Sequence, residues 1–419
     1  MARSTKAKIE SEDLRGFKYL KRVLALFERL HGAGCERDRA HNRTLHYDQL
    51  CGLVVLQLFS PMLDSLRALE HAGAVEKVQR KLGCERASIG SLSEAMRLFD
   101  PDLLLPIIAE LNAQLAPIAR DPRLRDVRHL VTIVDGTLLK ALPRIAEAMW
   151  LTTRTGTVHA AWRLHAHFEL GKYVPTRMDL TDGRNSGDSD EKNVLRKALE
   201  PGRLYVMDRW YAQFKLFNDV HAAASGYACR VRDNSAFDVV EERDVPAEAR
   251  AAGVLRDVVA DIGSSRGRPD HPLRLVLVRS EPHDKRSNRK GNTGAGPSDG
   301  IVRIATDLLD VPADVIALLY RYRYTIELFF RFFKHMLGCR HLMSHGPNGV
   351  RIQTYCAVIA CMLMSLYTGR KPTKRTYEML CFFFIGLATE AELVAHLGKP
   401  DRTGVKLRAK EALWKKLGV

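Results

Sequence analysis

The sequence predicts an α/β fold in which a mixed β-sheet is flanked by helices, with helical regions at both ends of the chain. Two short apolar runs, Leu130–Val134 and Leu204–Met207, are typical of buried central strands, and an aspartate directly follows each run. Apolar residues at helical spacing fill residues 47–114 and much of the C-terminal region 371–419. Central strands surrounded by helices indicate a layered α/β architecture.

The composition describes a folded globular protein with a strong positive charge. Its 419 residues are 46% hydrophobic and 27% charged, which predicts two to three domains with ample core. The formal net charge of +16 indicates a polyanionic partner, and nucleic acid is the first expectation. A membrane surface is disfavoured, because a basic amphipathic segment with a lipid-facing stripe is lacking.

Cysteine usage and the apolar runs predict a cytoplasmic protein. The eight cysteines form no CxxC pair and lie largely in apolar surroundings, which indicates reduced, buried thiols. Residues 1–10 are polar and basic, without the apolar core of a secretory signal. The apolar runs 356–364 and 381–385 are too short to span a bilayer and are expected to be core helices.

Residues 1–125 are expected to form a helical N-terminal domain. Within it, Ser91 precedes Glu94 by three residues, the spacing of a capping box at a helix start. A small helical domain with short turns is either a plain bundle or a domain that recognises DNA ends, and the pattern alone leaves both open.

Residues 126–234 are expected to form the first part of the core. The strand that ends at Asp135 is followed by an alternating strand at 164–170, whose His165 and His167 are either metal ligands or, in our preferred interpretation, its polar face. The elements expected next are a strand at 173–180, a helix at 190–199, the strand that ends at Asp208, a helix at 211–224 and a strand at 226–233.

Residues 235–300 interrupt the core as a β-rich insertion, and residues 301–370 return to it with a strand at 301–307. The insertion carries a basic cluster at 285–291, which is either a solvated loop or an arm that contacts DNA. The remaining residues, 371–419, are expected to be a helical, basic C-terminal region.

The stretch from Tyr320 to Lys334 is predicted to be one buried helix with a single polar stripe. At about 100° per residue, Tyr320, Arg323, Glu327 and Lys334 fall within roughly 60° of one another, and Arg331 lies just beside them. Most other positions are apolar, so the stripe must face a partner, a cleft or a ligand. A structural Arg–Glu network is the alternative interpretation.

Three carboxylates form a candidate site. Asp135 and Asp208 follow predicted central strands, where each is either a helix N-cap or a site residue, and Glu327 lies on the buried helix. Such a set attracts hard divalent cations such as Mg²⁺. Two of these ions about 4 Å apart suit in-line phosphoryl displacement.

Asp135, Asp208 and the spacing Tyr320-x2-Arg323-x3-Glu327-x6-Lys334 resemble the DDE transposases of bacterial insertion sequences. The four spaced residues match the Tyr-Arg-Glu-Lys signature of the IS-four family within that group. The contexts Ile133-Val134-Asp135-Gly136-Thr137 and Met207-Asp208-Arg209-Trp210-Tyr211 resemble its first two motifs, and the resemblance covers roughly residues 128–369. It implies an RNase H-like fold and supports a DNA-binding role for the N-terminal domain.

The resemblance implies a DNA transposase that cuts the ends of an insertion sequence and transfers the strands into target DNA. Asp135, Asp208 and Glu327 are then expected to hold two Mg²⁺ ions, with Mn²⁺ as a possible substitute. The expected DNA contacts are Tyr320, Arg323, Lys334, Arg331, Arg209 and Trp210. Trp210 either stacks on an unstacked base or packs in the core.

The implied partners are transposon-end DNA and target DNA, bound by a homodimer and associated with the bacterial nucleoid. Two alternatives remain open from the sequence. One is an RNase H-like nuclease that hydrolyses DNA without strand transfer, and the other is a non-catalytic DNA-binding protein derived from a transposase.

Overall fold

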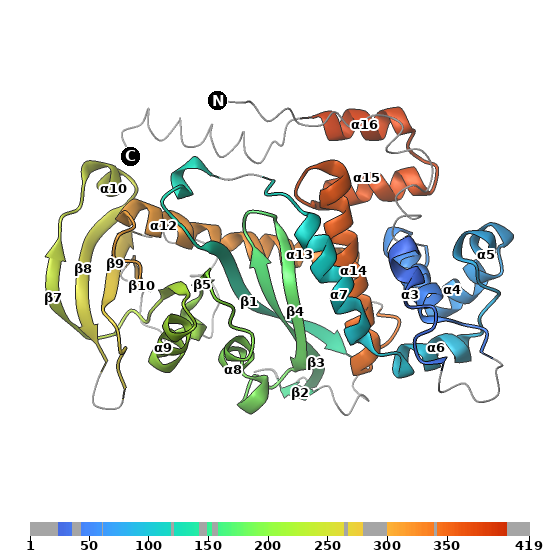
Figure 1. The fold of residues 1–419 in the computed structure, drawn as a ribbon, viewed down its shortest axis with the longest axis horizontal. Helices are drawn as coiled ribbons and strands as arrows, with labels where there is room; N and C mark the ends of the chain where they lie inside the picture. The colour runs from blue at the N-terminus through green and yellow to red at the C-terminus, as the bar shows by residue number, and fades with distance from the viewer. Residues whose placement is uncertain are drawn as a thin grey trace.

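A long mixed sheet runs through the middle of the molecule, with the N-terminal helices at one end and a β-rich extension at the other (Figure 1). The computed structural model describes residues 24–35, 43–60, 62–118, 121–141, 149–152, 158–263, 267–279, 300–338 and 342–399. The basic cluster at 285–291 and the basic residues of the C-terminal region beyond 399 lie outside these residues.

The first half of the sheet has the strand order of the RNase H-like fold, which confirms the predicted fold class. Strand β1 pairs antiparallel with β3, and β3 pairs antiparallel with β4. On its other edge β1 pairs parallel with β5, and β5 pairs parallel with β6. The strands are β1 (Leu130–Ala141), β2 (Met149–Thr152), β3 (Val158–Glu169), β4 (Val174–Asp182), β5 (Arg203–Met207) and β6 (Gly226–Arg230).

The strands of the β-rich insertion continue this same sheet. Strand β10 pairs antiparallel with β6, so the edge of the RNase H-like half is covered rather than left open to another chain. The order then runs β10, β9, β8, β7, and every pairing in this half is antiparallel. The strands are β7 (Phe237–Arg243), β8 (Val254–Ile262), β9 (Leu273–Arg279) and β10 (Ile301–Thr306).

Alternation along β1 and β5 divides the core between the two faces of the sheet. Ile133 and Val206 belong to one hydrophobic cluster, which includes the apolar residues of α12, α13 and α14. Val134 and Met207 belong to the other, with residues of α8 and α9. The helices are α8 (Glu191–Arg196), α9 (Phe214–Ala222), α12 (Ala313–Tyr322), α13 (Tyr324–Met336) and α14 (Pro347–Thr368). Since both faces are covered, the central strands are apolar on both sides.

Helix α14 joins the N-terminal helices to the sheet. It packs against α7, α3 and α6 on one side and against β4 on the other. By length and composition it could cross a membrane, but nearly all of it is buried inside the protein, so it is a core helix as expected. Further α-helices in the described part of the chain are α3 (Tyr47–Phe59), α4 (Leu66–Gly73), α5 (Glu76–Leu82), α6 (Ile89–Leu98), α7 (Leu105–Gln114), α10 (Ala247–Ala251), α15 (Lys374–Phe384) and α16 (Glu390–Gly398).

The stretch from Tyr320 to Lys334 is two helices, not the single helix that we predicted. Helix α12 ends at Tyr322 and α13 begins at Tyr324, with Arg323 at the junction. The Arg323 N–H donates to the Tyr320 carbonyl, and the Ile326 N–H donates to the Arg323 carbonyl. These hydrogen bonds join residues three apart, as in a 3₁₀ turn, whereas α-helical hydrogen bonds join residues four apart. The turn is therefore tighter, and the α-helical pattern is interrupted. Tyr320 therefore lies on a different helix from Glu327.

Two local predictions are also corrected. Helix α6 starts three residues before the predicted capping box, because the Ser88 side chain accepts the Ser91 N–H and Ser88 is the N-cap. His165 and His167 do share one face of β3, but this face is buried, and each residue is only 3% exposed. Burial lowers the pKa of each imidazole to about 4, so both are neutral at pH 7.

A buried ion pair attaches the β-rich extension to the core. Arg274 on β9 donates to Asp257 on β8 at 2.8 and 2.6 Å, and each side chain is 3% exposed. The same guanidinium donates to the carbonyls of Leu308 and Val311, in the segment that leads into α12. One side chain thus links two strands to the helix that precedes the Glu327 helix.

Replacing Arg274 by methionine should destabilise the protein strongly. The substitution leaves the Asp257 carboxylate buried without its cation, which typically costs about 3–5 kcal/mol. We expect a melting temperature several degrees below that of the unmodified protein in a thermal unfolding experiment. The control is Arg256→Met, which removes the exposed pair between Arg256 on β8 and Glu242 on β7 and should leave the melting temperature nearly unchanged. Equal effects of the two substitutions would contradict the assigned role of Arg274.

Candidate active site

Asp135 and Asp208 are neighbours on two parallel strands. The register of β1 and β5 pairs Ile133 with Val206. Two residues further on, Asp135 lies within β1 and Asp208 directly follows the end of β5, so the two carboxylates are close together. Neighbouring strands are about 4.8 Å apart. Alternation places both carboxylates on the Ile133 and Val206 face of the sheet, which is the face that packs against α12 and α13. The pairing of two strands therefore brings two like charges together.

Arg323 connects these carboxylates to Glu327. Its Nη1 lies 3.6 Å from Asp135 Oδ2, and its Nη2 donates to Glu327 Oε1 at 2.6 Å. All three side chains are largely shielded from solvent, with 16–28% of each exposed. Because one guanidinium contacts both acids, the helix carboxylate and the strand carboxylates face a common space.

The pKa of the Asp135 carboxyl group is shifted by burial and by the charged groups near it. Burial raises the pKa of its carboxyl to about 7, although the Arg323 guanidinium and the hydrogen bond from the Gly136 N–H both favour the ionised form. The negative charges of Asp208 and Glu191 also contribute to this raised pKa. A cation bound beside Asp135 would favour the ionised form of its carboxyl group.

A fourth carboxylate, Glu191, lies at the site and was not predicted. It is the first residue of α8, and its Oε1 accepts a hydrogen bond from Arg163 Nη1 at 2.5 Å. A Cβ atom at position 136 would lie 2.7 Å from the same oxygen, so Gly136 is the residue that lets Glu191 approach β1. The sequence gives little signal for Glu191, because a glutamate behind an N-cap aspartate is common in the first helical turn.

Tyr211 lies beneath the carboxylates. Its phenol is fully buried and hydrogen-bonds to Glu191, and burial together with the charges of Glu191, Asp135 and Asp208 raises the pKa of Tyr211 far above its usual value. The hydroxyl therefore stays protonated and can donate. Tyr211 lies within the second motif of the sequence, but a role for it was not predicted.

Of the predicted DNA contacts, Tyr320 and Trp210 lie beside the carboxylates. Burial raises the pKa of the Tyr320 phenol, which lies near Arg323 and Arg230. Trp210 follows Asp208 and is 53% exposed, so packing in the core is excluded. The Lys192 Nζ lies over its ring, 4.7 Å from the centroid. An exposed indole beside a cation is suited to stacking.

The other predicted contacts lie further from the carboxylates. Arg209 is half-exposed, with its Nη1 3.9 Å from Asp233 Oδ2. Arg331 is exposed and donates to the Tyr324 hydroxyl at 2.6 Å. Lys334 is half-buried and lies seven residues beyond Glu327 on α13, about 10 Å along the helix axis. These residues extend the site along the surface rather than forming its centre.

The donor set suits a hard divalent cation. Oδ1 of Asp135 accepts the Gly136 N–H, and Oδ1 of Asp208 accepts the Trp210 N–H, each at 2.8 Å. These hydrogen bonds fix the orientation of both carboxylates, as supporting contacts do around metal ligands. Asp208 is therefore both the cap of the short turn Arg209–Tyr211 and a member of the site. Carboxylate oxygens are the donors that Mg²⁺ and Mn²⁺ prefer.

Comparison with known proteins identifies the family. A family model described as the transposase DDE domain matches residues 127–363 of this chain. A Sinorhizobium fredii protein named as a transposase is 26% identical over 289 residues, which cover 67% of this chain and 74% of that protein. A Geobacillus stearothermophilus protein named as a transposase for the insertion sequence element IS5377 is 25% identical over 288 residues, which cover 67% of this chain and 66% of that protein.

Among solved structures, a piggyBac transposase synaptic complex with hairpin DNA matches with a TM-score of 0.42 and 12% identity, over 94% of this chain and 83% of that one. The family match carries the assignment, because it spans more than half of the sequence and contains all three predicted carboxylates. The chain therefore belongs to the DDE transposase family of bacterial insertion sequences, enzymes of phosphoryl transfer that use divalent metal ions.

Proposed function

We propose that this protein cleaves DNA at the ends of an insertion sequence and transfers the cut strands into target DNA, with Asp135, Asp208 and Glu327 as its catalytic carboxylates. The observation that carries the proposal is the register of β1 and β5, which sets Asp135 beside Asp208. The link from Asp135 through Arg323 to Glu327 supports the inclusion of the third acid.

The three carboxylates are assigned as ligands of two Mg²⁺ ions, which Mn²⁺ can replace. When bound, such ions supply an activated oxygen nucleophile and neutralise charge on the leaving oxygen. The protein contributes oriented carboxylates in a half-buried site, because backbone N–H groups hold Asp135 and Asp208 and the Arg323 guanidinium holds Glu327. The negative charges of Asp208 and Glu191 near Asp135 favour this assignment, because a bound cation reduces the repulsion between these carboxylates.

Arg323 is assigned two roles, one in the metal-free protein and the other after metal has bound. In the metal-free protein its guanidinium neutralises Asp135 and Glu327. A metal ion and this guanidinium compete for the same carboxylate oxygens, so metal binding releases Arg323. The released side chain is suited to a phosphate group near the cleavage point, since a guanidinium donates two parallel hydrogen bonds.

The remaining DNA contacts follow from chemistry and position. The buried Tyr320 hydroxyl is assigned to a phosphate oxygen near Asp208, and exposed Trp210 to stacking on a base at the cut end. Arg209, Arg331 and Lys334 are assigned to phosphates of the flanking strand.

The larger organisation is proposed from the positions of the elements. The helical N-terminal part at one end of the molecule is assigned to recognition of transposon-end DNA, and two copies of the chain are assigned to one DNA complex (Figure 1). The division at residues 125, 234, 300 and 370 and the membership in the IS-four family also remain proposals. An enzyme with this substrate acts at the nucleoid in the cytoplasm.

The proposal is tested with oligonucleotides copied from the inverted repeats that flank the gene. With Mg²⁺, the protein should cut the repeat end and join it to a second DNA. Cutting without joining would identify a nuclease, and binding without cutting would identify a DNA-binding protein that has lost catalysis.

Asp135→Asn should abolish cleavage while leaving DNA affinity within about twofold. The substitution removes a metal-ligand charge but no basic contact. End-cleavage and binding assays measure the two quantities side by side. Asp261→Asn, at an exposed aspartate on β8, is the control and should cleave normally. Substantial Mg²⁺-dependent cleavage by Asp135→Asn would reject the assignment.

Arg323→Ala should bind Mn²⁺ several-fold more tightly in the absence of DNA and yet cleave roughly 100-fold more slowly. Tighter binding follows because the competing guanidinium is gone, and slower cleavage follows from misplaced substrate. Calorimetric Mn²⁺ titration and single-turnover cleavage provide the readouts. Weaker Mn²⁺ binding by this variant would instead make Arg323 a structural support of the site.

Lys334→Ala should differ from Arg323→Ala in its effect on metal binding, because Lys334 lies two helical turns from Glu327. We expect unchanged Mn²⁺ affinity and a salt dependence of DNA binding that falls by about one unit for the lost phosphate contact. The measurement is DNA affinity across a series of salt concentrations. If the slope of log affinity against log salt concentration were unchanged, Lys334 would not contact a phosphate.

Glu191→Gln should raise the Mg²⁺ concentration needed for half-maximal cleavage about tenfold, as supporting residues of metal sites typically do. The variant leaves the Arg163 cation without its partner, and this unbalanced charge repels metal ions from the site. Glu169→Gln is a matched control, because Glu169 is a buried glutamate paired with Lys172 at the other end of β3. The same shift in both variants would indicate general destabilisation.

A further inference from the structure

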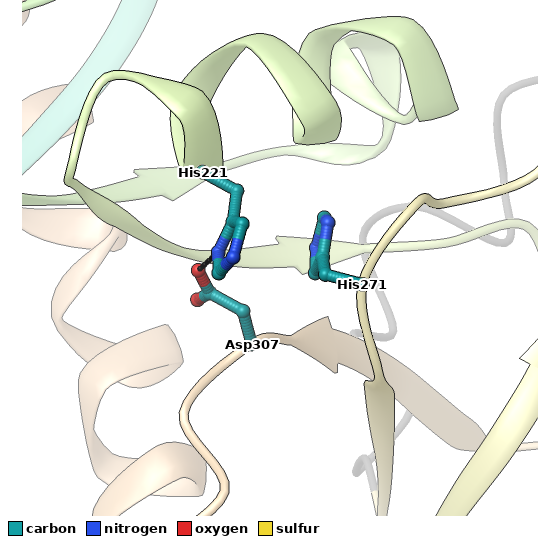
Figure 2. A group of neighbouring side chains, drawn as sticks. All are labelled: His221, His271 and Asp307. Atoms are coloured by element: carbon teal, nitrogen blue, oxygen red, sulfur yellow. Dashed lines mark hydrogen bonds and ion pairs between the residues drawn. The ribbon is translucent and has the colours of Figure 1, made fainter.

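A second cluster of metal-binding side chains lies away from the carboxylates. His221 comes from the last turn of α9, His271 from the segment before β9, and Asp307 from the residue after β10, and Figure 2 shows the three side chains facing one another. One potential ligand atom from each lies within 4.8 Å of the others. Three segments far apart in the sequence thus meet at one point.

This cluster and the catalytic carboxylates lie at opposite ends of the parallel strands. Asp307 Oδ1 accepts the N–H of Tyr227, near the start of β6, whereas Asp208 follows Met207, which pairs with Cys229 near the end of that strand. The strand rise separates these two levels by about 10 Å. The cluster is therefore a separate feature and not an extension of the carboxylate site.

His271 is held in a defined orientation. Its side chain is 4% exposed, and its Nδ1 lies 2.9 Å from Asp270 Oδ1, which fixes the proton on Nδ1. Its Nε2 is then a lone-pair acceptor, and the Tyr227 hydroxyl donates to it at 3.0 Å. A histidine whose Nδ1–H is bound by a carboxylate is the usual arrangement of a metal ligand.

Asp307 and His221 are also set for coordination. With Oδ1 of Asp307 bound to the backbone, its Oδ2 faces His221 Nδ1 at 3.2 Å. In a tetrahedral zinc site with bonds of 2.0–2.1 Å, neighbouring ligand atoms are about 3.3 Å apart. The two atoms already have this separation. The rings of His221 and His271 are stacked 4.2 Å apart and nearly parallel, so the exposed His221 ring must turn before both nitrogens can point at one ion.

The charges around the cluster favour a cation. In the described part of the chain, the ion-pair partners of Asp270 and Asp307 are the two histidines, not lysine or arginine. Asp307 has 7% of its side chain exposed, so a bound cation would be only partly screened by solvent.

We propose that His221, His271 and Asp307 bind a transition-metal dication of the Zn²⁺ type, with water in the fourth position. Imidazole nitrogen selects Zn²⁺, Co²⁺ or Ni²⁺ over Mg²⁺, which prefers an all-oxygen set such as the carboxylate site. The Tyr227 hydroxyl gives up its contact with His271 Nε2 to the metal. Because the side chain of His221 is 52% exposed, the ion exchanges with solvent and chelators remove it.

The bound metal joins α9, the start of β9 and the end of β10. It therefore fixes the β-rich extension to the RNase H-like half of the sheet at a second point, on the side of α9. Metal that binds only the folded protein also raises its thermal stability.

The experiment is a Co²⁺ titration of untagged, full-length protein, followed by visible absorption. It is performed in the double variant Asp135→Asn, Glu327→Gln, so that the carboxylate site does not contribute. We expect one equivalent of Co²⁺ with the intense absorption of a four-coordinate site, displaced by Zn²⁺, and a melting temperature raised by Zn²⁺.

Adding His221→Ala should abolish the absorption and the Zn²⁺-dependent rise in melting temperature. This exposed side chain contributes little to folding, so the variant should remain folded. His71→Ala, at an exposed histidine on α4, is the matched control and should retain both signals. Asp270→Asn should weaken Co²⁺ binding about tenfold, because it releases the His271 ring.

Two results would overturn the proposal. One is the lack of a four-coordinate Co²⁺ spectrum in the double variant at concentrations that saturate ordinary histidine sites. The other is a spectrum that survives His221→Ala, which would place the metal elsewhere in the chain.

Discussion

The pairing of β1 with β5 is the constraint on which the site depends. Parallel pairing at this register puts Asp135 and Asp208 side by side on one face of the sheet. Two half-buried like charges repel each other, and burial adds to the cost, so the surrounding structure must supply compensation. Arg323 supplies part of it, and the shifted pKa of Asp135 shows that the compensation is incomplete. A site left with unbalanced charge is suited to taking up cations.

Hydrophobic packing holds the third carboxylate in place. Phe329 on α13 packs against Phe168 on β3 and against Phe333 on its own helix, so one side of α13 is fixed to the sheet. The opposite side carries Glu327 and meets Arg323 at the junction with α12. The aromatic residues do no chemistry. They set the distance between a helix and a strand edge, and the chemistry depends on that distance.

The β-rich extension is attached to the same framework by polar contacts. Arg274 links β8 and β9 to the segment before α12, and the His221, His271 and Asp307 cluster links α9 to the far ends of β9 and β10. Both attachments join elements that lead directly to site residues. The position of the Glu327 helix therefore depends on residues of the extension as well as on the core.

The sequence by itself determined most strands and most helices, because those signals are local. The first central strand is an exception at its end, since β1 continues to Ala141, beyond the predicted end at Asp135. Apolar runs, glycine at 136 and the helical spacing around Glu327 are all visible within a few residues. Family resemblance then gave the RNase H-like order. The break at Arg323 was not predicted, since the same residues are compatible with one continuous helix.

Only the tertiary structure decided which distant residues meet. Glu191, the first residue of α8, reaches Gly136 on β1, and nothing near Glu191 in the sequence indicates this approach. His221 and Asp307 are 86 residues apart and come together through the pairing of β6 with β10. The buried side of β3 that carries His165 and His167 also follows from packing, because local alternation identifies a face but not what covers it. Contacts of this kind depend on strand order and helix placement, which local residue patterns do not contain.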